Sequence, residues 1–427
     1  MREMVKTDIP WMPEISSDFS VGYVKQYFFV SKDLSNDGEP ERVLKLARAG
    51  IVEKDVTTNE GQMAASYAGY NKVCVGDLLL NPMDLYSGAN CNVSELNGVI
   101  SPAYSNLRAK KTGTVVPKYY DYYFKSQYWL MAMFAHGKGV SFDNRWTLNN
   151  DALRSYEIPV APYAMQQKIV DAIQDGEKKV DSLIANVQAQ IEKLKTYKQS
   201  LITEVVTKGL DPNAPMKDSG IEWIGKIPDS WNVSRIKYIS DFGPTCDASK
   251  LTNDSIITYT PMECIKNGYF EPRSANYGAL SHSLTAFQDG DIVLAKVTPC
   301  FENGNIAIMS DLDSNYGLGS SELFVLRPRT IHTRYFFYWL QNRYFLERGR
   351  ATMTGTGGLK RVSPTFVKGC YIHIPPRQEQ EKIADVLDTK CAQINRFISL
   401  KESKIEKLQQ YKRSLIYEYV TGKKEVV

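Results

Sequence analysis

The chain has 427 residues, which at roughly 100 to 200 residues per domain allows two to four domains with ordinary hydrophobic cores. Its 43% hydrophobic and 23% charged residues are typical of a globular protein, and a net charge of +4 would be a weak nucleic-acid signal if it were spread evenly. No apolar run is long enough for a signal peptide or a membrane helix, so we expect a cytoplasmic protein.

Metal binding is not expected from the cysteines and histidines. The seven cysteines contain no CxxC pair, and the four histidines are isolated in sequence from cysteine and glutamate. Neither residue type shows the spacing of zinc ligands. We therefore expect reduced thiols and no bound metal.

Residues 1–157 mix strand and helix signals. The run VCVGDLLL at 73–80 is strand-like, and the aromatic stretch YYDYYFKSQYWLMAMF at 119–134 has helical character. Such aromatic residues could stack on bases, but they more often form core, and core is the interpretation we favour. Basic residues without an acid lie between Glu95 and Asp121, namely Arg108, Lys110, Lys111 and Lys118.

Residues 158–210 are predicted to form a long helix. Proline at 162 suits its start and Gly209 its end. The opposite face carries Lys, Glu and Gln, so the narrow apolar stripe needs a partner. Steps of three and four residues separate its apolar side chains, Val180, Leu183, Val187, Ile191, Leu194, Tyr197, Leu201 and Val205.

Residues 211–371 again mix strands and aromatic helical segments, and they hold most of the net positive charge. Between Leu323 and Arg361 there are eight Lys and Arg residues and a single acid, Glu347. The stretch TGTGGLKR at 354–361 places glycines beside Thr, Lys and Arg, so backbone N–H groups could approach phosphates while Arg reaches a base edge. The alternative is an ordinary flexible loop.

Candidate nucleic-acid contacts follow from these basic segments. The segment 136–146 lies in the place equivalent to 354–361, before its own long helix, and two readers of different sequences would differ in this way. The candidates in the first region are Lys110, Lys111, Lys138 and Arg145, and those in the second are Lys296, Arg350, Thr356, Gly357, Gly358, Lys360 and Arg361.

An internal duplication organises the chain. Residues 158–207 align onto 372–421 at a constant offset of 214, as IEKLKTYKQSLITEVVT and IEKLQQYKRSLIYEYVT show. The preceding regions correspond more weakly, with Gly76-Asp77 lying 214 residues before Gly290-Asp291.

The second copy, residues 372–427, is therefore a second long helix, and we expect the two helices to pair antiparallel. The alternative is that each packs only on its own globular region. The residues expected in the pairing are Leu183, Val187, Ile191, Leu194 and Leu201 of the first helix and Phe397, Ile405, Leu408 and Leu415 of the second.

The predicted fold is α+β with an internal pseudo-two-fold repeat. Two mixed α/β regions, 1–157 and 211–371, are separated by two similar helical spacers, 158–210 and 372–427, that are expected to form an antiparallel coiled coil.

Catalytic motifs were not found. The chain has no GxxxxGK[ST] phosphate loop, and Asn81-Pro82-Met83-Asp84 lacks the second proline and the aromatic residue that would hold a flipped base. Acid-x-Lys groups such as Glu402-Ser403-Lys404 lie on the predicted helices and suit a solvated face. We therefore expect no catalytic residue in this chain.

Three features together resemble the specificity subunits of Type I restriction-modification systems. They are SGIEWIGKIPDSWNVSRIKYI at 219–239, IPPRQEQEKIADVLD at 374–388, and the paired IEKL-x-x-Y-K-x-SLI helices. The first region departs from the pattern, because IPWMPEISSDFSVGYVKQYF at 9–28 keeps only a trace of the WIGKIPDSW signature.

The resemblance implies a non-catalytic subunit whose two target-recognition domains each read one half of an interrupted duplex DNA site. It also implies two modification (methyltransferase) subunits that bind S-adenosylmethionine, and restriction (endonuclease and translocase) subunits that use ATP and Mg. No cofactor is expected in this chain itself. Two alternatives stay open: a coiled-coil scaffold that binds no DNA, and a fragment of a single-chain restriction enzyme.

Overall fold

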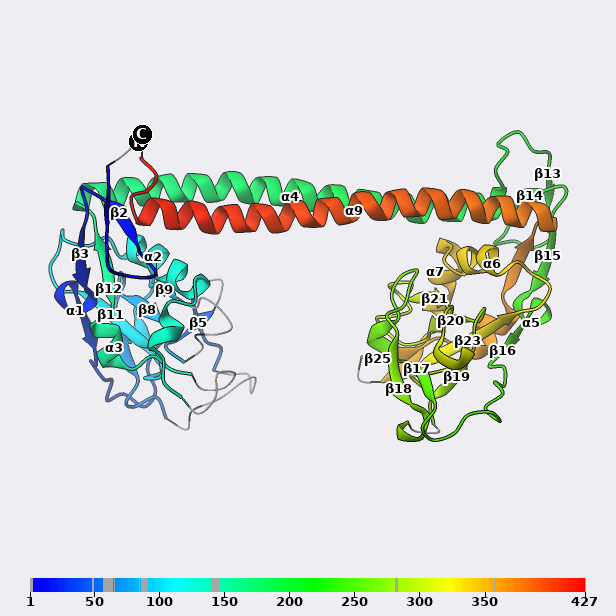
Figure 1. Cartoon of the computed structure of the whole chain (residues 1–427), viewed down its shortest axis with the longest axis horizontal. Helices are drawn as coiled ribbons and strands as arrows, with labels where there is room; N and C mark the ends of the chain where they lie inside the picture. Colours follow the sequence, from blue (N-terminus) through cyan, green and yellow to red (C-terminus); the bar gives the residue numbers. More distant parts are fainter. Residues whose placement is uncertain are drawn as a thin grey trace. The chain divides into compact units, whose positions relative to one another are not determined.

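Two compact units make up the chain, each with its own sheets and core. The computed structural model describes residues 3–47, 50–56, 64, 66–83, 85, 91–139, 146–280, 283–356 and 358–426. The first unit comprises Met1–Gln188 with Ser403–Val427, and the second comprises Ala189–Glu402. The long helices α4 (Tyr163–Lys208) and α9 (Arg377–Val420) each contribute one half to each unit. Figure 1 labels these elements.

The first unit contains short strands and helices in addition to its parts of α4 and α9. In chain order they are β1 (Met4–Lys6), β2 (Glu14–Ser16), β3 (Ser20–Tyr23), α1 (Val24–Tyr27), β4 (Phe28–Ser31), β5 (Val43–Ala47), β6 (Gly50–Glu53), β7 (Asn71–Val73), β8 (Leu78–Leu80), β9 (Cys91–Val93), β10 (Gly98–Ile100), β11 (Ser105–Ala109), α2 (Pro117–Trp129), η1 (Met133–His136), α3 (Asn150–Arg154) and β12 (Glu157–Val160).

The second unit has a corresponding series of elements. In chain order they are β13 (Met216–Asp218), β14 (Lys226–Pro228), β15 (Asn232–Arg235), α5 (Ile236–Ile239), β16 (Ser240–Phe242), β17 (Ile256–Thr260), η2 (Met262–Cys264), β18 (Arg273–Asn276), η3 (Tyr277–Ala279), β19 (Thr285–Phe287), β20 (Ile292–Ala295), β21 (Ile306–Ile308), η4 (Asp313–Asn315), β22 (Gly317–Gly319), β23 (Leu323–Pro328), α6 (Thr333–Trp339), α7 (Arg343–Ala351), β24 (Thr354–Thr356), β25 (Leu359–Arg361), α8 (Pro364–Gly369) and β26 (Tyr371–Ile374).

The strand order is the same in both units, which confirms the internal repeat. The four-stranded sheets run β4-β11-β8-β9 and β6-β5-β10-β7 in the first unit, and β16-β23-β20-β21 and β18-β17-β22-β19 in the second. Each unit has one parallel pair at the corresponding position, β5 with β10 and β17 with β22. The pairs β1-β2 and β12-β3 likewise recur as β13-β14 and β15-β26. Sequence divergence has therefore left the topology of the two regions intact.

The aromatic stretches form core, as expected. In the first unit the buried Tyr119 and Tyr123 of α2 donate hydrogen bonds to the backbone carbonyls of Val420 and Glu157, at 2.6 and 2.7 Å. In the second unit Trp339 of α6 is fully buried and donates through Nε1 to Nδ1 of His373 at 2.9 Å. The polar atoms of Tyr119, Tyr123 and Trp339 thus have partners, which offsets the cost of burying them.

The halves of α4 and α9 run antiparallel within each unit. In the first unit Lys412 Nζ lies 2.9 Å from Asp181, and a Cβ atom on Gly176 would lie 2.7 Å from Leu415. In the second unit Lys198 donates to Asn395 Oδ1 at 3.1 Å. In the first unit, the residue number on α9 rises as the number on its α4 partner falls, as an antiparallel pair requires. The expected coiled-coil pairing is therefore confirmed.

Two of the residues expected in the pairing face solvent instead. Leu183 is 51% exposed and Phe397 is 56% exposed, whereas the neighbouring Ile184 and Ile398 are half-buried. The predicted stripe was wrong by one residue here. Two apolar residues are adjacent at each position, so the spacing alone does not show which of them faces the partner helix. Of the other expected residues, Val187, Ile191 and Leu415 are buried, and Leu194, Leu201, Ile405 and Leu408 are half-buried.

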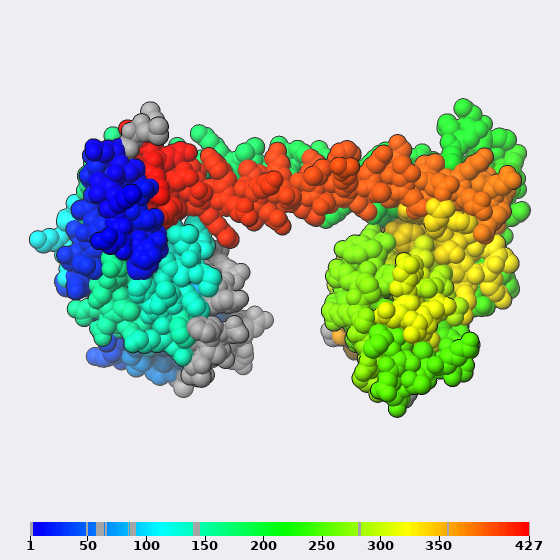
Figure 2. Space-filling model, viewed as in Figure 1, coloured from blue at the N-terminus to red at the C-terminus, as the bar shows by residue number. Residues whose placement is uncertain are grey.

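The chain's first strands cover the last turns of α9. Ser16 N donates to Thr421 O at 3.1 Å, and Tyr417 Oη donates to Trp11 O at 3.1 Å. Figure 2 shows these strands, in blue, directly against the end of α9, in red. The C-terminal half of α9 thus belongs to the same packed unit as the N-terminal strands.

Candidate nucleic-acid interface

The stretch 354–361 folds as a two-stranded hairpin in the second unit. Strands β24 and β25 pair antiparallel with Thr354 opposite Arg361, and all their side chains are exposed. Two glycines are needed by this hairpin. Gly358 has φ +82°, and a Cβ atom on Gly355 (φ +152°) would lie 2.1 Å from Leu359 O. Gly357 lies outside the described residues.

The hairpin is held to the sheet by the segment that follows β20. Thr298 N donates to Lys360 O at 2.9 Å, and Lys360 N donates back to Thr298 Oγ1 at 3.0 Å. Thr298 Oγ1 also donates to Gly358 O at 2.9 Å. The backbone of residues 358–360 is therefore fixed, while the Lys360 side chain is left at the surface.

Arg361 is oriented by a carboxylate, which the sequence did not indicate. Its Nε and Nη2 atoms both lie 2.8 Å from the two oxygens of Glu322, and these bonds hold the pKa of Glu322 below its usual range. Lys360 is exposed and has no ion-pair partner within the part of the chain that the structure describes. Of the two cations, Lys360 is thus the one available to a phosphate without breaking a pair.

Two further candidates of this unit also have partners. Lys296 N lies 3.1 Å from Glu322 O, and its Nζ donates to Ser321 O at 2.6 Å. Arg350, in the last turn of α7, lies 3.4 Å from the Glu302 carboxylate. The structure therefore gathers Lys296, Thr356, Gly358, Lys360 and Arg361 around one hairpin, with Arg350 on the helix that precedes it.

In the first unit, residues on either side of the corresponding segment pair with each other. Lys138 and Thr147 exchange two backbone hydrogen bonds, at 2.8 and 3.0 Å. Immediately beyond, Leu148 N donates to Pro82 O at 2.8 Å. The second unit has the same bond 214 positions later, where Val362 N donates to Lys296 O at 2.9 Å. Thr147 thus corresponds to Arg361. Arg145 lies outside the described residues, and the Lys138 side chain is exposed.

Lys110 and Lys111 lie elsewhere in the first unit, just after β11. Lys110 Nζ donates to the backbone carbonyl of Lys25 and lies 5.1 Å from the ring centre of Phe29. Arg329 makes the equivalent contact in the second unit, donating to Lys237 O at 3.4 Å. The contact recurs in both units, so we assign it a structural role in holding the α1 and α5 turns. Lys111 is exposed.

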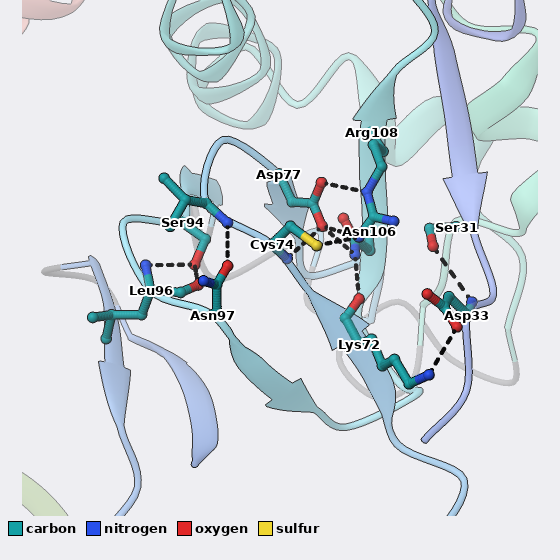
Figure 3. A network of polar contacts seen from close by, with 11 residues as sticks. Ser31, Asp33, Lys72, Cys74, Asp77, Ser94, Leu96, Asn97, Asn106 and Arg108 are labelled. Carbon is teal, nitrogen blue, oxygen red and sulfur yellow. Dashed lines mark hydrogen bonds and ion pairs between the residues drawn. The ribbon is translucent and has the colours of Figure 1, made fainter. Parts of the chain in front are cut away.

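A buried ion pair anchors the adjacent sheet in each unit. Figure 3 shows Arg108 of β11 bound through Nε and Nη2 to both oxygens of Asp77, at 2.8 and 2.7 Å. Asn106 Nδ2 and Cys74 N also donate to Asp77 Oδ2. The Asp77 partnership raises the pKa of Arg108 further. A charge held this way orders the sheet and is not free to bind a ligand.

The second unit repeats this ion pair. Arg327 Nε and Nη2 lie 2.7 and 2.8 Å from the carboxylate of the buried Asp291, and Nη2 approaches Cys246 Sγ at 3.4 Å, as Arg108 approaches Cys74. The repeated Gly-Asp dipeptide was visible in the sequence, but its arginine partner was not. Two of the eight basic residues between Leu323 and Arg361, Arg327 and Arg329, are therefore structural.

The described residues show neither a metal-binding cluster nor a membrane-spanning helix. Within the described ranges, no group of three or more His, Cys, Asp and Glu side chains is placed to hold a metal ion. None of the described helices is long and apolar enough to cross a membrane.

Solved structures share this architecture along nearly the whole chain. A chain from a structure of complex assembly in the type I R-M system superposes with a TM-score of 0.67 and 14% identity, covering 95% of this chain and 98% of the other. The HsdS subunit from Thermoanaerobacter tengcongensis gives a TM-score of 0.50 with 14% identity, covering 96% of this chain and 98% of that subunit. At this identity the likeness establishes the fold, which is that of an HsdS-like chain.

Sequence comparisons match part of the chain to a known domain family. Residues 228–410 match the Type I restriction modification DNA specificity domain. The specificity subunits of the Escherichia coli Type I restriction enzymes EcoAI and EcoEI are 36% and 32% identical over 163 residues, which is 37% of this chain. The match spans 27% of each of those two relatives. The chain thus carries a Type I restriction-modification DNA specificity domain, and the resemblance to specificity subunits is confirmed.

Proposed function

We propose that this chain is the DNA-specificity subunit of a Type I restriction-modification complex and reads a bipartite, gapped duplex DNA target. The specificity-domain match carries the proposal, and the duplicated topology supports one reader in each half. The recognition domains are 1–157 and 211–371, and the helical spacers are 158–210 and 372–427. The subunit itself catalyses no reaction and binds no cofactor.

The proposed DNA contacts centre on the two corresponding hairpin segments. In the second domain the Lys360 ammonium has no ion-pair partner among the described residues, while Arg361 is held by Glu322 in a fixed direction. A planar guanidinium of fixed direction suits the bidentate recognition of a base edge, whereas a free ammonium suits a phosphate. The other proposed contacts are Thr356, Gly357, Gly358, Arg350 and Lys296 in the second domain, and Lys110, Lys111, Lys138 and Arg145 in the first.

The helices are proposed to bind two modification subunits, one at each copy of a repeated apolar surface. Leu183 and Phe397, at equivalent positions of the repeat, are 51% and 56% exposed, and the equivalent Tyr197 and Tyr411 are 57% and 52% exposed. In the second unit Leu194, Tyr197 and Phe397 line a hollow of about 380 Å³. Exposed aromatic side chains of this kind are typical anchors of protein interfaces. Because the surface occurs twice, it suits two copies of one partner.

The complex is proposed to obtain its chemistry from those partners. Modification subunits would supply S-adenosylmethionine-dependent methylation, and restriction subunits would supply cleavage with ATP and Mg. This follows from the family resemblance, and the chain's own residues provide only recognition and assembly.

Selection from a pool of random duplex DNA tests the proposal. The full chain, purified with its methyltransferase partner, should enrich one motif made of two fixed half-sites separated by a gap of constant length. Salt-insensitive binding without enrichment would favour the coiled-coil scaffold. Cleavage by the lone chain would favour the fragment of a restriction enzyme.

Serine variants of Leu183 and Phe397 test the proposed partner surface. In the absence of the methyltransferase they should bind DNA like the unaltered chain, but they should recruit less methyltransferase.

A further inference from the structure

The second unit contains a polar pocket between its part of the helix pair and two loops of the sheet domain. The pocket has a volume of about 800 Å³. Its helical wall includes Lys198, Gln199 and Asn395, and its loop wall includes Asn267, Tyr269 and Asn305. Amide, hydroxyl and ammonium groups therefore converge on one space.

Lys198 carries a charge that the second unit does not neutralise. Its Nζ donates to the neutral amide oxygen of Asn395 at 3.1 Å, and no carboxylate lies within ion-pair distance among the residues that the structure describes. Burial lowers the pKa of Lys198. The ammonium is thus partly removed from water without a counter-ion, which is costly unless an anion binds there.

The repeat shows what a neutralised version of this position looks like. Lys412 is 214 residues after Lys198, and its Nζ lies 2.9 Å from Asp181 and 3.4 Å from Glu177. The residues 214 positions after these two acids are Asn395 and Cys391. The second unit has therefore replaced both counter-ions of an otherwise equivalent lysine with neutral side chains.

Neither of the two carboxylates that line the pocket, Glu192 and Glu402, forms an ion pair with Lys198. Glu192 is already paired with Lys195 at 2.9 Å. Glu402 also lines the pocket, but its side chain is exposed and makes no ion pair with a described residue. Of the two lysines that line the pocket, Lys198 is therefore the one without a carboxylate partner among the described residues.

We propose that this pocket binds a backbone phosphate of duplex DNA, with Lys198 as the cation and the surrounding Asn, Gln and Tyr side chains as further donors. The inference rests on the proposed function and adds a contact outside both hairpin segments. Lys, Asn, Gln and Tyr side chains are among the groups that contact phosphate oxygens in protein–DNA complexes. A phosphate contact fixes position and register without reading sequence, so it acts on every DNA alike.

The decisive variant is Asn395→Asp, which restores the counter-ion found in the first unit. It should keep or raise the thermal stability of the full chain, because it recreates the Lys412–Asp181 pair. Binding to a 40-base-pair duplex of random sequence should become roughly ten-fold weaker, since Lys198 would already be paired. The slope of log K against log [KCl] should lose about 0.9, the contribution of one phosphate. Lys198→Met should have the same effect on the slope.

Lys412→Met is the matched control, because it removes the same charge from the equivalent position in the first unit. Its salt slope should equal that of the unaltered chain. The inference is wrong if Asn395→Asp and Lys198→Met both bind the duplex with unchanged affinity and slope. It is also wrong if these variants lose the methyltransferase partner but not DNA, which would identify a carboxylate of that partner as the ligand. Absence of salt-sensitive DNA binding by the unaltered chain would instead overturn the proposed function.

Discussion

The two units have the same frame but present different chemistry at their hairpins. In both, a buried aspartate holds an arginine on the neighbouring strand, and a backbone bond ties the hairpin's end to the segment after β8 or β20. At the position of Thr147 in the first unit, the second unit has Arg361 with its partner Glu322. Duplication thus preserved the buried contacts and the topology while the exposed residues at these positions diverged. That is the pattern expected of two readers with different targets.

The largest effect is expected when one whole recognition domain is exchanged. Replacing residues 1–157 with the corresponding domain of a relative should change one half-site completely and leave the other unchanged. Each unit has its own core, so each should act alone. Methylome sequencing of cells that express the chimaera with its partners measures both half-sites. A simultaneous change in both would show that the readers are not independent.

Such a chimaera must keep the contacts that tie the first domain to the end of α9. Tyr119 donates to Val420 O, and Tyr417 donates to Trp11 O. A donor domain that lacks the tyrosine or the Trp11 turn would lose stability for reasons unrelated to recognition. A chimaera that retains both is therefore the matched control for folding.

A second prediction separates the roles of Lys360 and Arg361 in the second hairpin. Lys360→Ala should weaken binding to all duplexes alike and reduce the salt slope by about one, as loss of a phosphate contact does. Arg361→Ala should weaken binding to the selected motif by between about five-fold and a hundred-fold and relax one base position. Competition binding with matched and mismatched duplexes measures both effects.

Arg343→Ala is a suitable control for these two variants, because Arg343 is an exposed arginine of the same unit that is paired with Glu347 at 2.6 Å. It should bind like the unaltered chain. If Lys360→Ala and Arg361→Ala behave like this control, the hairpin does not contact DNA.

The frame was predictable from the sequence because it depends on local patterns and on the repeat. The alignment at an offset of 214 predicted the paired helices, whereas the pairing of residues 354–361 as a hairpin was not predicted. The partners of the predicted site residues were not predictable, because they are distant in sequence. Glu322 lies 39 residues from Arg361, and Lys25 lies 85 residues from Lys110.

The error at Leu183 and Phe397 has a different origin. An apolar isoleucine follows each of them about 100° further around the helix, so the apolar spacing fits either residue and only the packing against the partner helix distinguishes the buried side. The same limit hid Lys198, since a lysine in a helix normally suggests a solvated face. Comparing its neighbours across the repeat, where Asp181 becomes Asn395, would have shown the missing counter-ion.

A third prediction concerns acid stability, in which the two units should differ. His373 is buried in the second unit, accepts a hydrogen bond from Trp339, and has its pKa lowered by burial to about 4. The residue 214 positions earlier is Pro159, which does not titrate. As the pH falls below about 6.5, the unfolded second unit takes up a proton that the folded unit does not. Stability is therefore lost between about pH 6.5 and 4, by on the order of 3 kcal/mol.

Thermal unfolding as a function of pH, followed by hydrogen exchange in each unit, tests this difference. The second unit should become the less stable one in acid. His373→Asn keeps an acceptor for Trp339 but cannot titrate, so it should flatten the loss over this pH range. An equally steep loss in that variant would assign the acid sensitivity to other groups.

The last prediction concerns the helix pair as a spacer, and the structure determines where it should be lengthened. An insertion after Val206 would be unsuitable, because Val206 is buried in the second core and its carbonyl accepts from Tyr335. Seven residues added to α4 after Gln190 and seven added to α9 before Lys401 would preserve the heptad spacing and the antiparallel pairing. The addition is about 10 Å of helix, or roughly three base pairs of duplex if all of it becomes separation along the DNA. The methylome should then show the same two half-sites with a gap longer by up to about three base pairs. Lengthening α4 alone would shift its partners against α9 and should reduce stability without giving a defined new gap. An unchanged gap in the doubly lengthened, folded protein would mean that the helices do not set the spacing, and altered half-site bases would mean that they take part in recognition.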